Sequence, residues 1–233
     1  MDLSYAKFLL EQTKKDYDKI ASYFAKTRKY FPKDLYFVEQ LVEKEDVILD
    51  LGCGNGIFFP FIRKKVKNYF GVDISSNLIT LAKKTFLEGN FQVTPFLSLP
   101  FPSKFFDKVF CFAVLHHIPS KTFRIKFLKE IKRVLKPDGI LILTVWNLWK
   151  EPKIWPLILK FTLLKILRLI RCDFKDIFYP FKNEKGEILA NRYFHCFTLP
   201  ELNSLFKQAG FKVENFKRIK RNNHENFLIV GKC

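Results

Sequence analysis

The chain has 233 residues, of which 48% are hydrophobic, and this length and composition suit one medium-sized domain with a large core. Its formal net charge of +18 is spread along the sequence and favours an anionic partner, either nucleic acid or an acidic membrane surface, although a generally lysine-rich composition would give the same charge. The five cysteines include no CxxC pair, and residues 1–10 are too short and too charged for a secretory signal, which argues against a disulfide framework and favours free thiols in the cytoplasm.

The N-terminal part of the chain reads as a helical cap followed by a cofactor-binding core. Residues 1–44 predict two helices separated near Pro32. Apolar runs at 46–53, 69–74, 90–96, 107–114 and 139–146 predict strands, and the patterns at 57–67, 76–86 and 121–135 predict helices between them. Because apolar strands that alternate with helices are typical of a parallel sheet covered on both faces, residues 45–146 predict an α/β core.

After Trp146 the pattern changes. A basic, leucine-rich helix is predicted at 153–171 and an irregular stretch continues to about residue 197, so residues 147–197 are expected to form an inserted helical lid. Residues 198–233 are expected to form a helix at 199–209, ended by Gly210, and two strands within 211–218 and 226–232. These elements complete a single domain over residues 1–233. Lysine and arginine interrupt the apolar run at 153–171, so it is poorly suited to span a bilayer.

The helix expected at 153–171 carries a set of basic residues that share one face. At 100° per residue, these four side chains fall within about 80° of one another: Lys153, Lys160, Arg168 and Arg171. Such a basic amphipathic helix could lie on an anionic membrane, contact nucleic-acid phosphates, or simply cover the sheet.

A glycine loop follows the first strand in "ILDLGCGNG". Asp50 comes first, then Gly52, Gly54 and Gly56 form a GxGxG turn, and Asp73 ends the next strand, where a carboxylate can take both hydroxyls of a ribose. An acid ahead of the glycines suits a cationic ligand better than a pyrophosphate. S-adenosylmethionine carries an ammonium and a sulfonium group, so the sequence predicts this cofactor over an ordinary strand–turn–helix. The residues expected to bind the cofactor are Asp50, Gly52, Gly54, Asn55, Gly56, Asp73, Ile74 and Ala113.

Four segments together resemble the type 11 group of class I S-adenosylmethionine-dependent methyltransferases. They are "VILDLGCGNG", "GVDIS", "LPFPSKFFDKVFCFAVLHHI" and "LKEIKRVLKPDGILIL". The resemblance implies an enzyme with a seven-stranded sheet in the order 3-2-1-4-5-7-6, strand seven being antiparallel. Pro95 stands where the family often has an acid that holds the adenine amino group. The resemblance therefore leaves adenine to backbone groups and packing.

The flanking segments are similar to those of tRNA methyltransferases that esterify 5-carboxymethyluridine at the wobble position. These segments are "YDKIASYFAKTR", "AVLHHI", "TVWN" and "RYFHCFTLPEL", the last departing from the family at Phe194, Leu199 and Pro200. The resemblance implies a tRNA substrate and a small zinc-binding activator protein, for which the apolar third strand would offer a sheet edge. The alternatives are a quinone-type enzyme that methylates a small molecule or lipid precursor at a membrane, and a non-catalytic subunit, against which the intact glycine loop argues.

The same resemblance implies a set of substrate-site residues near the carboxyl edge of the sheet: Arg28, His116, His117, Trp146, Arg192, Tyr193 and His195. A metal is not expected, because no third ligand lies near the histidine pair and methyl transfer needs none. The alternatives are a structural role for the histidines, with a ring donating to a backbone carbonyl, and core packing for Trp146. Because a carboxylate substrate with a pKa of roughly 4 is already ionised, the expected roles are orientation by arginine and histidine and aromatic stacking on uracil.

Overall fold

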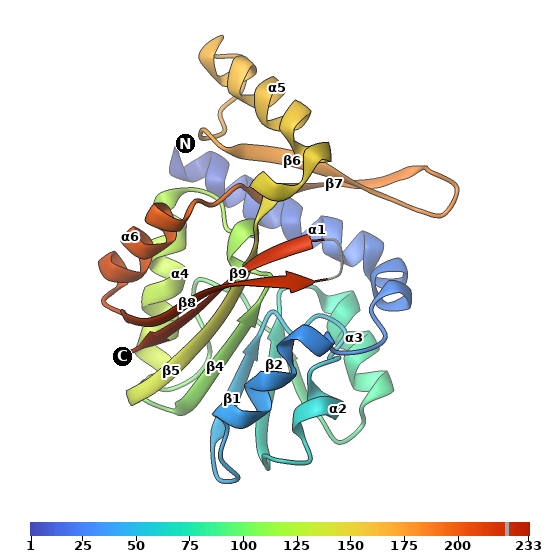
Figure 1. Ribbon diagram of the computed structural model, residues 1–233. Coiled ribbons are helices and arrows are strands. Elements are labelled where there is room, and N and C mark those ends of the chain that lie inside the picture. Colours follow the sequence, from blue (N-terminus) through green and yellow to red (C-terminus); the bar gives the residue numbers. More distant parts are fainter. Residues whose placement is uncertain (222–223) are drawn as a thin grey trace.

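A seven-stranded sheet forms the centre of the computed structural model, which describes every residue except 222 and 223 (Figure 1). The strand order is β3-β2-β1-β4-β5-β9-β8; β1 to β5 run parallel, and β9 is antiparallel to both β5 and β8. This order confirms the predicted one, with β9 and β8 as strands seven and six. The strands are β1 (Val47–Leu51), β2 (Asn68–Asp73), β3 (Asn90–Val93), β4 (Phe106–Phe112), β5 (Leu135–Trp146), β8 (Lys212–Arg221) and β9 (His224–Lys232).

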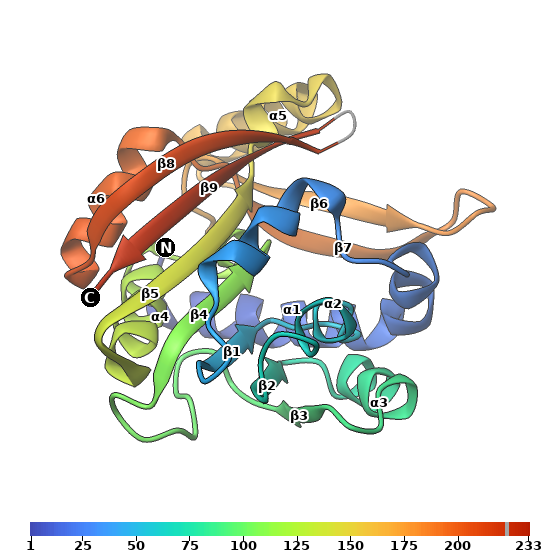
Figure 2. The same cartoon turned by 60° about the horizontal axis from the view of Figure 1, so that its bottom comes forward.

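Helices cover both faces of this sheet. One face packs against α4 (Lys121–Val134) and α6 (Leu199–Ala209), and the other against α2 (Phe59–Ile62), α3 (Ser76–Thr85) and the 3-10 helix η1 (Lys33–Leu41). The long helix α1 (Leu3–Thr27) lies across the carboxyl ends of the strands (Figures 1 and 2). Hydroxyl caps fix the helix starts, since the Ser75 and Ser120 side chains each accept from a backbone N–H in the first turn.

Two N-terminal predictions were wrong in detail. The second helix of the cap is a 3-10 helix, and the helix expected at 57–67 is reduced to the single turn of α2. Asn68 at the start of β2 is already in register with Val47 of β1, so the chain after Ile62 must turn at once toward the sheet. The buried side chains of this turn pack against η1 and β2, and packing rather than helix length therefore stabilises it.

The insertion after β5 differs from the predicted helical lid. The short helices η3 (Leu148–Lys150) and η4 (Pro152–Ile154) lead into α5 (Trp155–Ile166), and the stretch expected to be irregular is an antiparallel hairpin of β6 (Asp176–Lys182) and β7 (Ile188–His195). A turn closes the hairpin. The backbone oxygen of Asn183 accepts from the Gly186 N–H, and the Asn183 N–H donates to the backbone oxygen of Glu187. Gly186 has φ +83°, a conformation that favours glycine. This turn is the local feature that the sequence interpretation missed.

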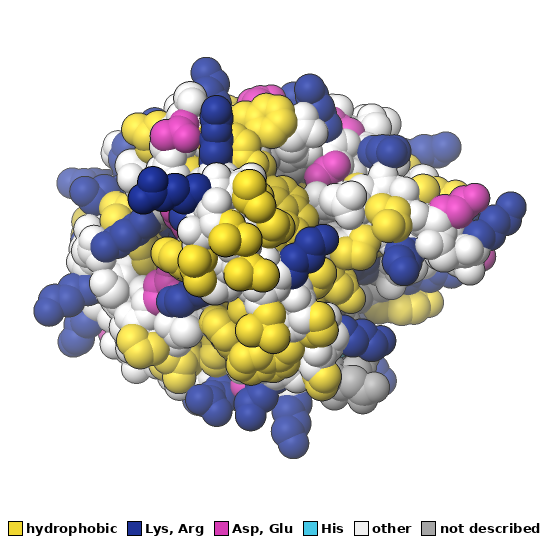
Figure 3. Space-filling model, turned by 90° about the horizontal axis from the view of Figure 1, so that it is seen from above, with side chains coloured by type: hydrophobic (Ala, Val, Ile, Leu, Met, Phe, Trp, Pro, Cys, Tyr) yellow, Lys and Arg dark blue, Asp and Glu magenta, His cyan; other side chains and the backbone are white. Residues whose placement is uncertain are grey.

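The basic face expected over 153–171 is not formed. Of its four residues only Lys160 lies on α5, since Lys153 precedes the helix and Arg168 has a left-handed φ of 58° beyond its end. The outward side of α5 is instead apolar, with Leu159, Leu163 and Ile166 between 56% and 65% exposed. Figure 3 shows hydrophobic side chains gathered among lysines and arginines on this side of the molecule. Across the part of the chain that is described, no helix is long and apolar enough to cross a membrane.

A buried polar cluster ties the hairpin to the core. Arg124 on α4 donates to the Tyr193 hydroxyl at 2.9 Å and lies 3.4 Å from Asp176, and Tyr193 donates to Asp176 at 2.8 Å. His195 contacts Asp176 at 2.6 Å and Glu201 of α6 at 2.7 Å. Burial opposes ionisation of Glu201, but hydrogen bonds and charges from His195 and Lys175 outweigh it and lower its pKa to about 2.

We expect Arg124→Met to reduce the free energy of unfolding by about 3–5 kcal/mol, because it leaves the buried Asp176 carboxylate without its cation. Denaturant titration followed by circular dichroism measures the change. The matched control is Arg63→Met, which removes the exposed ion pair with Glu88 and should change stability by less than about 1 kcal/mol. Equal effects of the two substitutions would show that the cluster does not anchor the hairpin.

Candidate functional site

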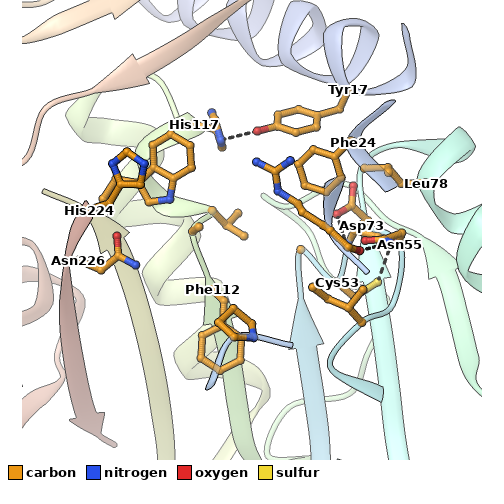
Figure 4. A pocket seen from close by; sticks show the side chains of 18 of the residues that line it. Tyr17, Phe24, Cys53, Asn55, Asp73, Leu78, Phe112, His117, His224 and Asn226 are labelled. Atoms are coloured by element: carbon orange, nitrogen blue, oxygen red, sulfur yellow. Dashed lines mark hydrogen bonds between the residues drawn. The ribbon is translucent and has the colours of Figure 1, made fainter. Parts of the chain in front are cut away.

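A cavity of about 570 Å³ opens at the carboxyl ends of the strands, beneath α1. The loops after β1, β2, β4 and β5 line it, together with the first residues of β9. Figure 4 shows Asn55 and Asp73 on one side of this cavity and His224 and Asn226 on the other. Open α/β sheets bind their ligands at this edge.

The glycine loop can adopt its path only with glycine at its key positions. Gly52, Gly54 and Gly56 all have positive φ, at +82°, +56° and +79°. A Cβ on Gly52 would lie 2.2 Å from Val114, and one on Gly56 would lie 2.9 Å from Phe91. Gly52 and Gly54 line the cavity, whereas Gly56 packs the loop against β3 behind it.

Asp73 holds the loop and faces the cavity. Its carboxylate accepts from the backbone N–H of Gly54 and of Ser75, both at 2.9 Å. Burial raises its pKa to about 6, and these two hydrogen bonds act in the opposite direction. Asp73 therefore links the start of α3 to the glycine loop while its oxygens remain beside the ligand space.

Asp50 is the second buried carboxylate of the cavity. It accepts a hydrogen bond from the Tyr69 hydroxyl at 2.7 Å, and burial raises its pKa to about 7, with the hydrogen bond opposing this shift and the charge of Asp73 adding to it. Among the described residues, neither Asp50 nor Asp73 is ion-paired with lysine, arginine or histidine. Two buried carboxylates without a cation fit a positively charged ligand such as S-adenosylmethionine.

The remaining residues predicted for the cofactor also reach the cavity. Asn55 donates to the backbone oxygen of Arg28 at 3.0 Å, which ties the glycine loop to the end of α1. Ala113 has a left-handed φ of 59° at the end of β4, where the chain turns along the cavity wall. Ile74 lines the cavity with Leu78 and Phe96, so this wall near Pro95 is apolar, as expected for adenine held by packing.

His117 reaches the cavity in a fixed, neutral form. Its Nδ1 lies 2.9 Å from the Tyr193 carbonyl, which can only accept, so Nδ1 carries the hydrogen and Nε2 accepts from the Tyr17 hydroxyl at 2.7 Å. Burial lowers its pKa to about 3, the carbonyl hydrogen bond opposes this, and the charge of Arg192 adds to it. The ring makes the backbone contact expected of a structural histidine, and its lone pair is already engaged.

His116 and Trp146 both stack on the ring of Phe194, His116 behind the cavity and Trp146 in its wall. His116 is fully buried and does not line the cavity; its ring stacks on Phe194 with centroids 5.2 Å apart. Trp146 does line the cavity, and its ring stacks on the same Phe194 at 5.3 Å. Trp146 therefore packs against Phe194 and also forms part of the cavity wall.

The predicted arginines occupy different positions. Arg28 lines the cavity at the end of α1, with its guanidinium 3.9 Å above the Phe24 ring. Arg192 is buried one layer behind, 3.5 Å from the Tyr17 hydroxyl and 5.1 Å from the Phe194 ring. Of the seven substrate-site residues, the structure brings three to the cavity wall, Arg28, His117 and Trp146, and places Arg192 and His116 behind it. The prediction that Tyr193 and His195 also line the site was wrong, because both belong to the buried polar cluster that anchors the hairpin.

Several cavity residues received no individual role from the sequence. Tyr17 bridges His117 and Arg192, and a polar group at the far end comprises Asn147, Glu151, His224, Glu225 and Asn226. Their position depends on the antiparallel pairing of β9 with β5, which sets Trp146 opposite Asn226. The predicted sheet order could have revealed this juxtaposition, since it places the end of strand five beside the start of strand seven.

Comparison with known proteins decides the family. Residues 49–143 match the family described as Methyltransferase domain. A SAM-dependent methyltransferase from Methanosarcina mazei has the same fold, with a TM-score of 0.71 at 25% identity over 84% of this chain and 96% of that one. An uncharacterized protein of Methanocaldococcus jannaschii is 32% identical over 86% of this chain and 76% of its own length. This chain belongs to the class I S-adenosylmethionine-dependent methyltransferases. Its cofactor is S-adenosylmethionine.

Two further likenesses concern substrate and partner. The tRNA (carboxymethyluridine(34)-5-O)-methyltransferase of Arabidopsis thaliana is 37% identical over 136 residues, or 58% of this methyltransferase. The match spans 32% of that relative's length, about a third. A chain from the complex between the Haloferax volcanii Trm112 methyltransferase activator and a methyltransferase shares the fold, with a TM-score of 0.67 at 18% identity over 94% of this chain and 96% of that one.

We expect the affinity for S-adenosylmethionine to fall roughly tenfold between pH 8 and pH 6. The cationic cofactor favours ionised Asp50, so below the free pKa of about 7 binding must first release a proton. Isothermal titration calorimetry in two buffers measures both the affinity and the proton.

The variant Asp50→Asn should bind S-adenosylmethionine weakly. It should retain only the smaller pH dependence of affinity that Asp73 contributes at its pKa of about 6. The matched control is Asp46→Asn, which removes a buried acid outside the cavity and should keep the full dependence. An affinity independent of pH in the parent enzyme would contradict the role given to Asp50.

Proposed function

We propose that this methyltransferase methylates the carboxylate of 5-carboxymethyluridine at the wobble position of a tRNA. The observation that carries the proposal is the state of His117, the histidine that reaches the cavity from the end of β4. With a pKa of about 3 and its Nε2 engaged by Tyr17, this ring is unsuited to remove a proton from a substrate. A nucleophile that is ionised before it binds removes the need for a base.

A carboxylate meets that condition. Bound S-adenosylmethionine supplies an electrophilic methyl group on a positively charged sulfur. A carboxylate oxygen would donate its electron pair to that methyl carbon as the bond from carbon to sulfur breaks, giving a methyl ester and S-adenosylhomocysteine. No proton moves in this step. Because the carboxylate has a pKa of roughly 4, catalysis reduces to holding the oxygen in line with the methyl group.

The cavity residues suit this orienting role. Arg28 presents a guanidinium, whose planar fork matches a carboxylate. Tyr17 is held between Arg192 and His117, so its hydroxyl has a fixed position in the cavity wall. Trp146 is supported from behind by Phe194 and could stack on the uracil ring.

The proposed partners follow from charge and from the sheet edge. A formal charge of +18 favours binding to the phosphates of an anticodon arm. Strand β3 lies at one edge of the sheet, opposite β8 (Figure 2), and Val93 on it and Leu87 before it are exposed. We propose this edge as the contact for a small zinc-binding activator, as the resemblance implies. The Haloferax volcanii chain that shares the fold comes from a complex with the Trm112 methyltransferase activator.

A second candidate is methylation of a small molecule or lipid precursor at a membrane surface. The apolar outward side of α5 favours it, because Trp155, Leu159 and Leu163 are exposed next to Lys160 and Lys165. An exposed apolar surface with a basic rim is suited to contact an anionic bilayer.

The deciding assay supplies the purified enzyme, with its activator if required, with wobble-modified tRNA and separately with quinone and phenol precursors. We expect a methyl ester on tRNA, and kcat at saturating cofactor should be flat between pH 6 and pH 8 because no base is used. Transfer to the small molecules with none to tRNA would leave only the second candidate.

Arg28→Ala should lower kcat on the tRNA substrate by on the order of 100-fold and leave cofactor affinity nearly unchanged, because it removes a contact to the substrate carboxylate. Single-turnover kinetics and calorimetry give the two values. Lys26→Ala is the matched control, since this lysine lies in the last turn of α1, just before the C-cap residue Arg28, but does not line the cavity. Equal rates in both variants would remove Arg28 from the mechanism.

A further inference from the structure

The end of the cavity opposite the glycine loop is polar in a way that methyl transfer itself does not explain. Asn147 follows the last residue of β5, and Asn226 lies near the start of β9, directly opposite Trp146 in the register of the two strands. Both asparagines line the cavity. Figure 4 shows Asn226 across the cavity from Asn55 and Asp73, which belong to the cofactor side.

Asn147 has a side-chain carbonyl oxygen with no hydrogen-bond partner in the described part of the chain. Its side chain is 4% exposed, its backbone N–H donates to the Glu225 backbone oxygen at 2.8 Å, and its Nδ2 donates to the Glu225 carboxylate at 2.6 Å. Because an ionised carboxylate only accepts, this contact fixes which end of the amide faces Glu225. Among the residues that the structure describes, the other end, Oδ1, is buried without a hydrogen-bond partner. A buried acceptor of this kind in a cavity wall is satisfied when a ligand brings a donor.

Asn226 supplies the complementary group. It is 2% exposed, and its side chain makes no hydrogen bond with any other residue that the structure describes. Asn226 lies opposite Trp146 and Asn147 follows Trp146 in the chain, so the two amides border the same end of the cavity. Together they can offer one fixed acceptor and one donor to the edge of a planar ligand.

We infer that Asn147 and Asn226 form a subsite that recognises the imide edge of uracil. Asn147 Oδ1 accepts from the N3–H of the base, and Asn226 Nδ2 donates to one of the flanking carbonyl groups. Trp146, the last residue of β5, lines the cavity next to this subsite and provides a ring on which the base can stack. The inference rests on the proposed function, and it adds the means by which the enzyme selects the base.

The donor pattern of the base makes this selection strict. Uracil presents a donor at N3, whereas cytosine presents an acceptor there, which would face Asn147 Oδ1 lone pair to lone pair. The carbon that carries the carboxymethyl group lies on the other side of the pyrimidine ring from the bond between N3 and C2. A base held by its imide edge at the far end would therefore direct its carboxylate toward Arg28 and the cofactor side.

The experiment uses two anticodon stem–loop RNAs that differ only in the wobble base, 5-carboxymethyluridine or 5-carboxymethylcytidine. We expect the parent enzyme to prefer the uridine RNA by at least about 100-fold in kcat/KM. Asn147→Ala and Asn226→Asp, which remove the acceptor and the donor, should each reduce this preference below roughly tenfold. Both should bind S-adenosylmethionine as the parent does.

The control is Asn191→Ala, at an exposed asparagine on β7, which should keep the full preference. Two results overturn the inference while leaving the proposed function intact. The first is an unchanged preference for the uridine RNA in both variants. The second is an equal loss of kcat/KM on the two RNAs together with weaker cofactor binding, which would mean that the asparagines only hold β5 to β9. If the parent enzyme methylates neither RNA, the proposed function fails and this inference fails with it.

Discussion

Two buried carboxylates that are ion-paired with no cation among the described residues are the constraint on which the site depends. Asp50 and Asp73 lie at the carboxyl ends of neighbouring parallel strands, and burial raises the pKa of both. Burying an ionised carboxylate raises the free energy of the folded protein unless an opposite charge and hydrogen bonds compensate for the lost hydration. Tyr69, the glycine-loop backbone and Ser75 supply hydrogen bonds, and the missing charge is that of the cofactor.

The second half of the site depends on a different buried cluster. Arg124, Asp176 and Tyr193 fix β7 against α4, and the backbone carbonyl of Tyr193 then sets the tautomer of His117. That tautomer leaves Nε2 to accept from Tyr17. Anchoring of the inserted hairpin is thereby connected to the geometry of the cavity, although Arg124 lines none of it. Breaking the cluster should disturb substrate positioning as well as stability.

The sequence predicted the parts of this molecule that local patterns determine. The parallel strands and the glycine loop follow from apolar runs, glycines and acids at fixed positions, and Asp50 and Asp73 lie where those patterns place them. The strand order was implied by the resemblance to the class I methyltransferases. The hairpin β6–β7 was missed because its strands are stabilised by packing on α5 and by the cluster around Asp176, which are distant in sequence. Tyr193 and His195 were misplaced for the same reason, since strand alternation turns them toward that cluster while Phe194 faces the stack with Trp146.

In the proposed reaction the nucleophile is ionised before it binds, and methyl transfer therefore moves no proton. Proton release per turnover tests it most directly, measured in weakly buffered solution with a pH indicator while S-adenosylhomocysteine is quantified in parallel. Transfer to a carboxylate converts a cationic sulfonium and an anionic carboxylate into two neutral groups, so we expect no net proton release. One proton released for each methyl group transferred would mean a hydroxyl, amine or ring-carbon acceptor, and would contradict it.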